Sequence, residues 1–312
     1  MSPADDHQLM IPVTVIGGYL GAGKTTLING LLGGDHGRRL AVLVNDFGAI
    51  DIDAKLIAAH DGDTISLANG CVCCTIADAL GDALDKVLAM PAAPDQIVIE
   101  ASGVANPAKI AMYGQGWPGL RLDGIVTVVD GESVRARADD KFVAATVRQQ
   151  LAAADLLVLH KTDLLAEEQQ TAVRHWLRQQ APGTRLLAAS FGDLPAAVLL
   201  GQGSFSSRQY DDLAAHDIYR TASFQFSGPF DRECLAARIK AWPAGVLRAK
   251  GLVYLDDDPG HAHILQLVGR RYSLEQGPAW NGETPASRIV VIGTDPDIDP
   301  KWLRGSLLQN RQ

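Results

Sequence analysis

The chain has 312 residues, of which 47% are hydrophobic and 21% are charged, and its formal net charge is −8. This length and balance predict a well-packed globular protein of two domains and exclude a largely disordered chain. The negative charge argues against nucleic-acid binding, because phosphate contacts need clustered Lys and Arg side chains.

The first ten residues are polar and acidic, with neither a basic start nor an apolar centre, which is unlike a secretory signal. No apolar run approaches the roughly 18 residues that would suggest a membrane span. Three of the four cysteines lie within residues 71–74, a pattern that fits a reducing compartment better than a disulfide scaffold. We therefore expect a soluble, cytoplasmic protein that contacts neither membrane nor nucleic acid.

Short apolar runs alternate with amphipathic stretches through residues 1–200. Most runs are continuous and β-branched, as is typical of parallel strands buried on both faces. This alternation predicts an α/β domain with a doubly wound, mostly parallel sheet. The expected strands are 13–17, 40–45, 64–67, 96–102, 124–130, 155–160 and 184–190.

Residues 201–217 lose the apolar period and gather Gly, Ser and Asp, which predicts a linker. Residues 218–312 then predict a small α+β domain with a largely antiparallel sheet. Its expected strands are 223–227, 246–255, 262–274 and 287–293, and its expected helices are 232–242 and 299–309.

A phosphate loop is the most specific motif, because residues 18–25 match G-x-x-x-x-G-K-[ST] between an expected strand and an expected helix. Glycines allow backbone N–H groups to wrap around phosphates, Lys24 would bridge the β- and γ-phosphates, and the Thr25 hydroxyl would ligate Mg²⁺. A Gly-rich strand–helix turn is the alternative. The expected nucleotide-binding residues are Gly18, Gly21, Ala22, Gly23, Lys24, Thr25 and Thr26.

Glu100 ends the strand that begins at residue 96 and is followed by Gly103. A carboxylate at that position can orient a Mg²⁺-bound or attacking water, and the Gly103 N–H can meet the γ-phosphate. The alternative is an ordinary strand-end carboxylate without a role in hydrolysis.

Residues 160–163, with the sequence HKTD, resemble the guanine loop [N/T]-K-x-D. The Asp163 carboxylate would accept the N1–H and N2–H₂ donors of guanine, while the Lys161 stem would cover the base. Adenine lacks that donor pair, so the loop predicts GTP rather than ATP. His160 stands where an amide usually braces the loop, and a surface turn is the alternative.

The cysteine cluster follows an Asn-Gly turn signal and comprises Cys71, Cys73 and Cys74. Thiolates select soft or borderline ions such as Zn²⁺, Co²⁺ or Cu⁺ over Mg²⁺. A redox pair of Cys71 and Cys74, or three structural cysteines, are the alternatives. Cys234 lies alone in a helical stretch, where we expect a buried, inert thiol.

Together, GGYLGAGKTTLING, VNDFG (44–48), NGCVCC, EASGVANP (100–107) and HKTD resemble the CobW-like family of metal-associated GTPases, relatives of the nickel-insertion GTPases of urease and hydrogenase maturation. Residues 228–242, 246–255 and 287–293 resemble the CobW carboxy-terminal domain. The resemblance implies GTP hydrolysis to GDP with Mg²⁺, and delivery of a metal to a client metalloprotein or metal-cofactor enzyme. The implied metal is zinc or cobalt, or iron in some members.

By this resemblance, Asp46 and Gly48 belong to the first switch, and Glu100 is the hydrolytic carboxylate. The catalytic set is then Lys24, Glu100 and Asp46, with guanine read by Lys161 and Asp163. The metal ligands are Cys71, Cys73 and Cys74.

The chain departs from the family pattern at Val44 and Ala49, where many members carry Glu. A fourth metal ligand is then left to Asp46, Asp51, Asp53, water or a client. The pair His261 and His263 is expected to be a surface feature. Two other functions remain open, namely a metal sensor or scaffold without meaningful turnover, and a P-loop ATPase or kinase. The sequence is also compatible with a homodimer.

Overall fold

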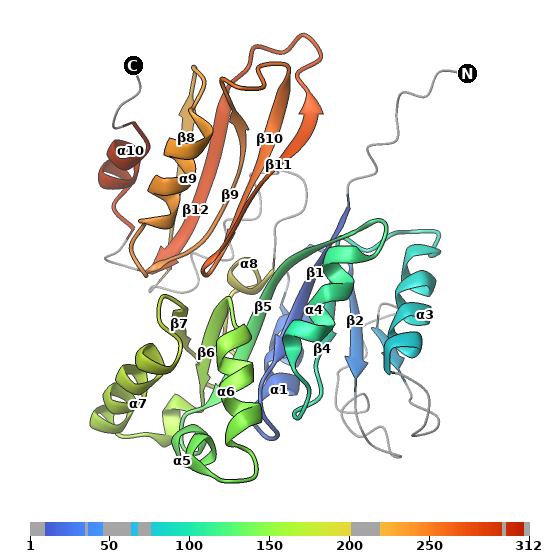
Figure 1. The fold of residues 1–312 in the computed structure, drawn as a ribbon, viewed down its shortest axis with the longest axis vertical. Helices are drawn as coiled ribbons and strands as arrows, with labels where there is room; N and C mark the ends of the chain where they lie inside the picture. Colours follow the sequence, from blue (N-terminus) through green and yellow to red (C-terminus); the bar gives the residue numbers. More distant parts are fainter. Residues whose placement is uncertain are drawn as a thin grey trace. The chain divides into compact units, whose positions relative to one another are not determined.

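The computed structural model describes residues 10–34, 37–45, 64–67, 76–200, 219–294 and 298–308. The chain divides into two compact units, Met1–Phe205 and Ser206–Gln312, each with a sheet of its own (Figure 1). The predicted boundaries stay a prediction, because the expected linker at 201–217 lies outside the described residues. The same is true of the sites expected at Asp46 and Gly48 and at the three clustered cysteines.

The first unit is built on a seven-stranded sheet with the order β3-β2-β4-β1-β5-β6-β7. Every neighbouring pair in it is parallel, which confirms the expected doubly wound α/β fold. Continuous burial along the central strands explains their uninterrupted apolar sequences. The strands are β1 (Ile11–Gly17), β2 (Leu40–Asn45), β3 (Thr64–Leu67), β4 (Gln96–Glu100), β5 (Leu120–Asp130), β6 (Leu156–His160) and β7 (Arg185–Ala188).

Helices cover both faces of this sheet, with α4 and α6 on one face and α1 on the other (Figure 1). One core cluster joins β1 and β4 to α3 and α4, and a second joins β5 and β6 to α5, α6 and α7. The described helices are α1 (Lys24–Gly33), α3 (Ile76–Leu88), α4 (Pro107–Gly116), α5 (Val134–Asp139), α6 (Ala144–Ala153), the 3-10 helix η1 (Thr162–Leu164), α7 (Glu167–Gln180) and α8 (Ala196–Leu199).

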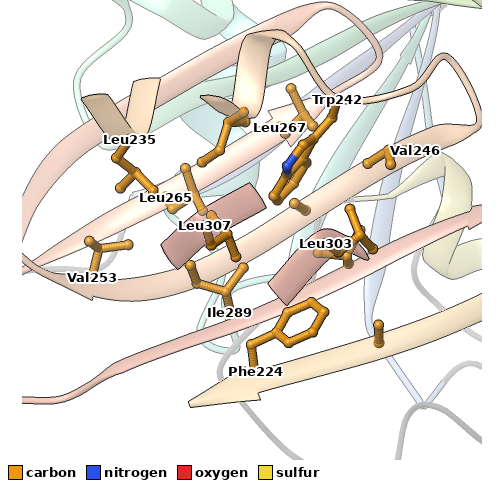
Figure 2. Close-up of a cluster of buried hydrophobic side chains, with 14 of the residues drawn as sticks. Phe224, Leu235, Trp242, Val246, Val253, Leu265, Leu267, Ile289, Leu303 and Leu307 are labelled. Atoms are coloured by element: carbon orange, nitrogen blue, oxygen red, sulfur yellow. The ribbon is translucent and has the colours of Figure 1, made fainter. Parts of the chain in front are cut away.

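The second unit is a five-stranded sheet with the order β11-β10-β9-β12-β8, in which each pair is antiparallel. Helices α9 (Arg232–Lys240) and α10 (Pro300–Leu308) both pack on it, as Figure 2 shows for Leu235, Leu303 and Leu307. This confirms the expected α+β domain. The strands are β8 (Tyr219–Phe226), β9 (Val246–Tyr254), β10 (His261–Val268), β11 (Arg271–Ala279) and β12 (Ser287–Thr294).

Three expectations about the second unit are wrong. The single strand expected at 262–274 is the hairpin β10–β11, which turns at Gly269 with a φ of +52°. Cys234 is exposed, because α9 directs Leu235 and Ile239 into the core instead. His263 is buried at 2% exposure, since it lies on the helix-covered side of β10 and contacts Arg232 at 3.1 Å.

Candidate functional site

The phosphate loop connects the end of β1 at Gly17 to the start of α1 at Lys24. Gly18, Gly21 and Gly23 have φ angles of +140°, +72° and +102°, which side chains other than glycine rarely adopt. A Cβ on Gly18 would also collide with the backbone of Val128 in β5. The glycines are therefore required by the path of the backbone, which can direct successive N–H groups towards an anion.

Lys24, Thr25 and Glu100 meet at the start of α1. The Thr25 hydroxyl donates to Glu100 Oε1 at 3.3 Å, and Lys24 Nζ lies 4.0 Å from the same oxygen. Glu100 is only 2% exposed and pairs in register with Ile16, so β4 delivers its carboxylate beside the phosphate loop. A hydroxyl and a carboxylate are hard oxygen donors of the kind that Mg²⁺ prefers, so these residues fit that ion.

The loop after Glu100 is fixed from α6. The Gln150 side chain donates to the carbonyl oxygens of Gly103 and Ala105, both at 3.0 Å. Gly103 packs so closely on Leu20 that a Cβ would lie 2.6 Å from a Leu20 methyl carbon. Gly103 is therefore adjacent to the phosphate loop, and Gln150 is a supporting residue that sequence analysis missed.

A second support comes from α5, where Arg137 donates to the Leu20 carbonyl oxygen at 2.7 Å. Its guanidinium also lies 5.0 Å from the centre of the Tyr19 ring, a cation–π contact. Nothing in the local sequence of α5 indicates this role, because Arg137 lies 117 residues from Leu20.

The guanine loop follows β6 and places Lys161 in a left-handed conformation, with a φ of +59°. Lys161 Nζ forms a 2.9 Å ion pair with Asp130 Oδ2 at the end of β5. Burial alone would raise the pKa of Asp130, but Lys161, the Glu132 N–H and the Ser133 side chain hold it below its ordinary value. Asp163 is exposed to solvent, as a base-reading carboxylate must be.

His160 is 4% exposed and lies between the phosphate loop and the loop after β7. Its Nε2 accepts the Gly192 N–H at 3.0 Å, and a Cβ on Gly23 would lie 2.6 Å from its Cε1. Burial, reinforced by Lys161, lowers the pKa of His160. A neutral ring whose Nε2 accepts a hydrogen bond carries its proton on Nδ1. Imidazole thus occupies the position where the sequence departs from the usual amide.

The loop after β7 is part of the same assembly, which sequence analysis missed by extending a strand through residue 190. Thr162 Oγ1 and Ser190 Oγ are 2.9 Å apart. Phe191 and Gly192 both have positive φ angles, +54° and +77°. The Phe-Gly pair was the available sequence signal, since glycine after an apolar strand marks a turn.

Comparison with known proteins agrees with this geometry. Residues 12–188 match the family described as CobW/HypB/UreG, nucleotide-binding domain, which is more than half of the chain. The chain belongs to the CobW/HypB/UreG family. Residues 219–310 of this CobW/HypB/UreG protein match the cobalamin synthesis protein cobW C-terminal domain.

Curated relatives of this CobW/HypB/UreG member extend over almost its full length. The zinc chaperone CobW of Sinorhizobium sp is 33% identical and covers 98% of this chain and 99% of its own. The zinc chaperone YjiA of Escherichia coli is 30% identical, over 91% of this chain and 94% of its own. The zinc-regulated GTPase metalloprotein activator 1 of Dictyostelium discoideum is 26% identical, over 94% and 73%.

Among solved structures, the Zn(II)-bound YjiA GTPase from E. coli aligns with a TM-score of 0.44 and 24% identity, covering 97% of this chain and 99% of its own. The fold of this CobW/HypB/UreG member is assigned from the strand order of its own sheets.

Two features are absent from the described part of the chain. No group of three or more His, Cys, Asp or Glu side chains in that part is arranged to hold a metal ion. No helix in that part combines the length and the apolar character needed to cross a bilayer.

Proposed function

We propose that this protein is a GTP-hydrolysing metallochaperone that carries one transition-metal ion on Cys71, Cys73 and Cys74 and delivers it to a client protein. The observation that carries this proposal is the buried Glu100 carboxylate, hydrogen-bonded to Thr25 and beside Lys24 at the mouth of the phosphate loop. Near-full-length relatives named zinc chaperones support zinc as the cargo, and cobalt is the alternative.

Residues Gly18 to Thr26 bind the phosphates, through backbone N–H groups and the Lys24 ammonium. Thr25 would hold Mg²⁺, and the bound ion would neutralise charge on the phosphate oxygens. Glu100 accepts a proton from, or orients, the attacking water, and the Gly103 N–H meets the γ-phosphate. Gln150 keeps that loop against Leu20, so the N–H is positioned before the nucleotide arrives.

Guanine selection falls to Asp163, whose exposed carboxylate is free to accept two ring donors. The ion pair with Asp130 holds the Lys161 ammonium at 2.9 Å and leaves its aliphatic stem to cover the base. This division of labour favours GTP hydrolysis over an ATPase or kinase activity.

The positions at which β2, β3 and β4 end support coupling between metal binding and nucleotide binding. Asn45 of β2 pairs with Leu67 of β3, and Val44 pairs with Glu100 of β4, so these three strands end at one edge. Asp46 directly follows β2, and Cys71 follows β3 by four residues, a span of at most about 14 Å. An ordered switch around Asp46 would then complete the metal site, and hydrolysis would release the ion.

The test is a metal titration against a chromophoric chelator, with Mg²⁺ and either GDP or a non-hydrolysable GTP analogue. We expect tighter Zn²⁺ binding with the analogue and, by linkage, tighter analogue binding with Zn²⁺ by the same factor. Equal metal affinities in the two states would contradict the delivery mechanism. A hydrolysis rate that neither metal nor client raises would favour a metal sensor instead.

A further inference from the structure

Two exposed apolar side chains lie in the loops that would surround the base. Leu164 follows Asp163 in the guanine loop and is 56% exposed, and Phe191 in the loop after β7 is 77% exposed. Phe191 also has a φ of +54°, an uncommon conformation for a bulky residue. Strained backbone of this kind persists only where its surroundings hold it, and it concentrates at functional sites.

The residues on either side of Phe191 are both anchored to the guanine loop. Ser190 Oγ lies 2.9 Å from Thr162 Oγ1, and the Gly192 N–H donates to His160 Nε2 at 3.0 Å. The strained residue is therefore held at both ends.

Helix α1 closes the loop from the other side. A Cβ on Gly192 would lie 2.6 Å from the Thr26 carbonyl oxygen, and a Cβ on Gly30 would lie 2.6 Å from the Gly192 carbonyl oxygen. The loop is thus clamped between α1 and the guanine loop, which leaves the Phe191 backbone little freedom to relax.

We propose that Phe191 is a base-contacting residue. Its ring packs against one face of the guanine base, and Asp163 reads the edge of the same base. Phe191 directly follows Ser190, and Asp163 directly follows Thr162, and these two preceding residues are the hydrogen-bonded pair. The Cα atoms of Phe191 and Asp163 therefore each lie about 3.8 Å from the Cα atom of one member of that pair. A purine offers donors and acceptors at its edge and an apolar π-face above and below. Asp163 reads the edge, the Lys161 stem covers one face, and Phe191 covers the other. This inference rests on the proposed nucleotide-binding function.

The experiment compares Phe191→Ala, Phe191→Gly and Phe191→Trp in the full chain by calorimetric titration with Mg²⁺-GDP. Phe191→Ala should weaken GDP about tenfold, because base–aromatic stacking is sequence-tolerant but substantial. Phe191→Trp should stay within about twofold of wild type, since it keeps an aromatic face. Phe142→Ala is the matched control, because Phe142 is 80% exposed in the connection between α5 and α6.

Two further measurements separate a base contact from damage to the loop. Phe191→Gly removes the strain of a positive φ and should melt at or above the wild-type temperature, yet bind GDP as weakly as Phe191→Ala. Inorganic tripolyphosphate, which has no base, should bind wild type and all Phe191 variants equally. GDP affinity unchanged in Phe191→Ala, or an equal loss of tripolyphosphate affinity, would overturn the inference.

A failure of the proposed guanine specificity is distinguishable from a failure of this inference. Equal affinities of the wild-type protein for ADP and GDP would contradict the assignment of guanine recognition to Asp163. In that case, the base contact of Phe191 would still appear as weaker binding of both ADP and GDP by Phe191→Ala.

Discussion

The hydroxyl of Thr25 donates a 3.3 Å hydrogen bond to the buried carboxylate of Glu100. Glu100 Oε1, at the end of β4, thus contacts the first turn of α1. The same oxygen atom lies 4.0 Å from Lys24 Nζ. Lys24, the proposed phosphate contact, and Glu100, the proposed hydrolytic carboxylate, therefore lie side by side.

Glu100→Gln should slow GTP hydrolysis by about 100-fold or more while leaving nucleotide affinity nearly unchanged, because the amide keeps the shape but cannot act as a base.

Lys24→Ala should weaken the binding of GDP and GTP by about 10- to 100-fold, through loss of a charge-assisted phosphate contact. Single-turnover hydrolysis and equilibrium titration separate the two effects. Wild-type turnover in Glu100→Gln would move the hydrolytic role to Asp46.

Asp163→Asn should weaken GDP by tens- to hundreds-fold, since losing a charge-assisted pair costs about 2–3 kcal/mol. The same change should improve xanthosine diphosphate, whose C2 carbonyl needs a donor. Competition between the two nucleotides measures the exchange directly. A variant that keeps the wild-type order of preference would show that guanine is read elsewhere.

His160 predicts a pH dependence of stability, because its pKa is lowered in the folded chain by burial and by Lys161, against opposing effects of Asp163 and Asp130. An unfolded histidine takes up a proton near pH 6.5, whereas folded His160 resists it to lower pH. Stability should therefore fall as the pH drops below about 6.5, until the folded pKa is reached.

His160→Asn removes this contribution and places at position 160 the amide that is usual in this loop. Melting temperatures between pH 5 and 7.5 should show a shallower slope for this variant than for wild type. His175→Asn is the matched control, because His175 is exposed on α7. Identical slopes in His160→Asn and wild type would contradict the assignment.

Cys73→Ser should weaken Zn²⁺ binding by more than about 100-fold, since removing a direct ligand costs more than removing a supporting contact. Its melting temperature without metal and its GDP affinity should match those of wild type. Cys234→Ser is the control, because that exposed thiol on α9 belongs to the second unit. The expected stoichiometry is one ion per chain, measured by metal analysis after gel filtration.

The phosphate loop and the parallel sheet were predictable because their signals are local, namely glycine spacing and continuous apolar runs. Contacts that brace the site were not, because they join distant segments. Gln150 lies 47 residues from Gly103, and Gly192 lies 32 residues from His160. The β10–β11 hairpin was missed because its turn carries one glycine, Gly269, as a signal between the two strands.

The packing of His160 against Gly23 makes these two positions interdependent. A methyl group at position 23 would overlap the imidazole ring, so the glycine cannot be enlarged while the ring stays where it is. A larger residue at position 23 would therefore need a smaller side chain at position 160, and it would still have to adopt a φ of +102°. The contact thus links the phosphate loop to the guanine loop, so the side chain at position 160 is limited by the backbone at position 23.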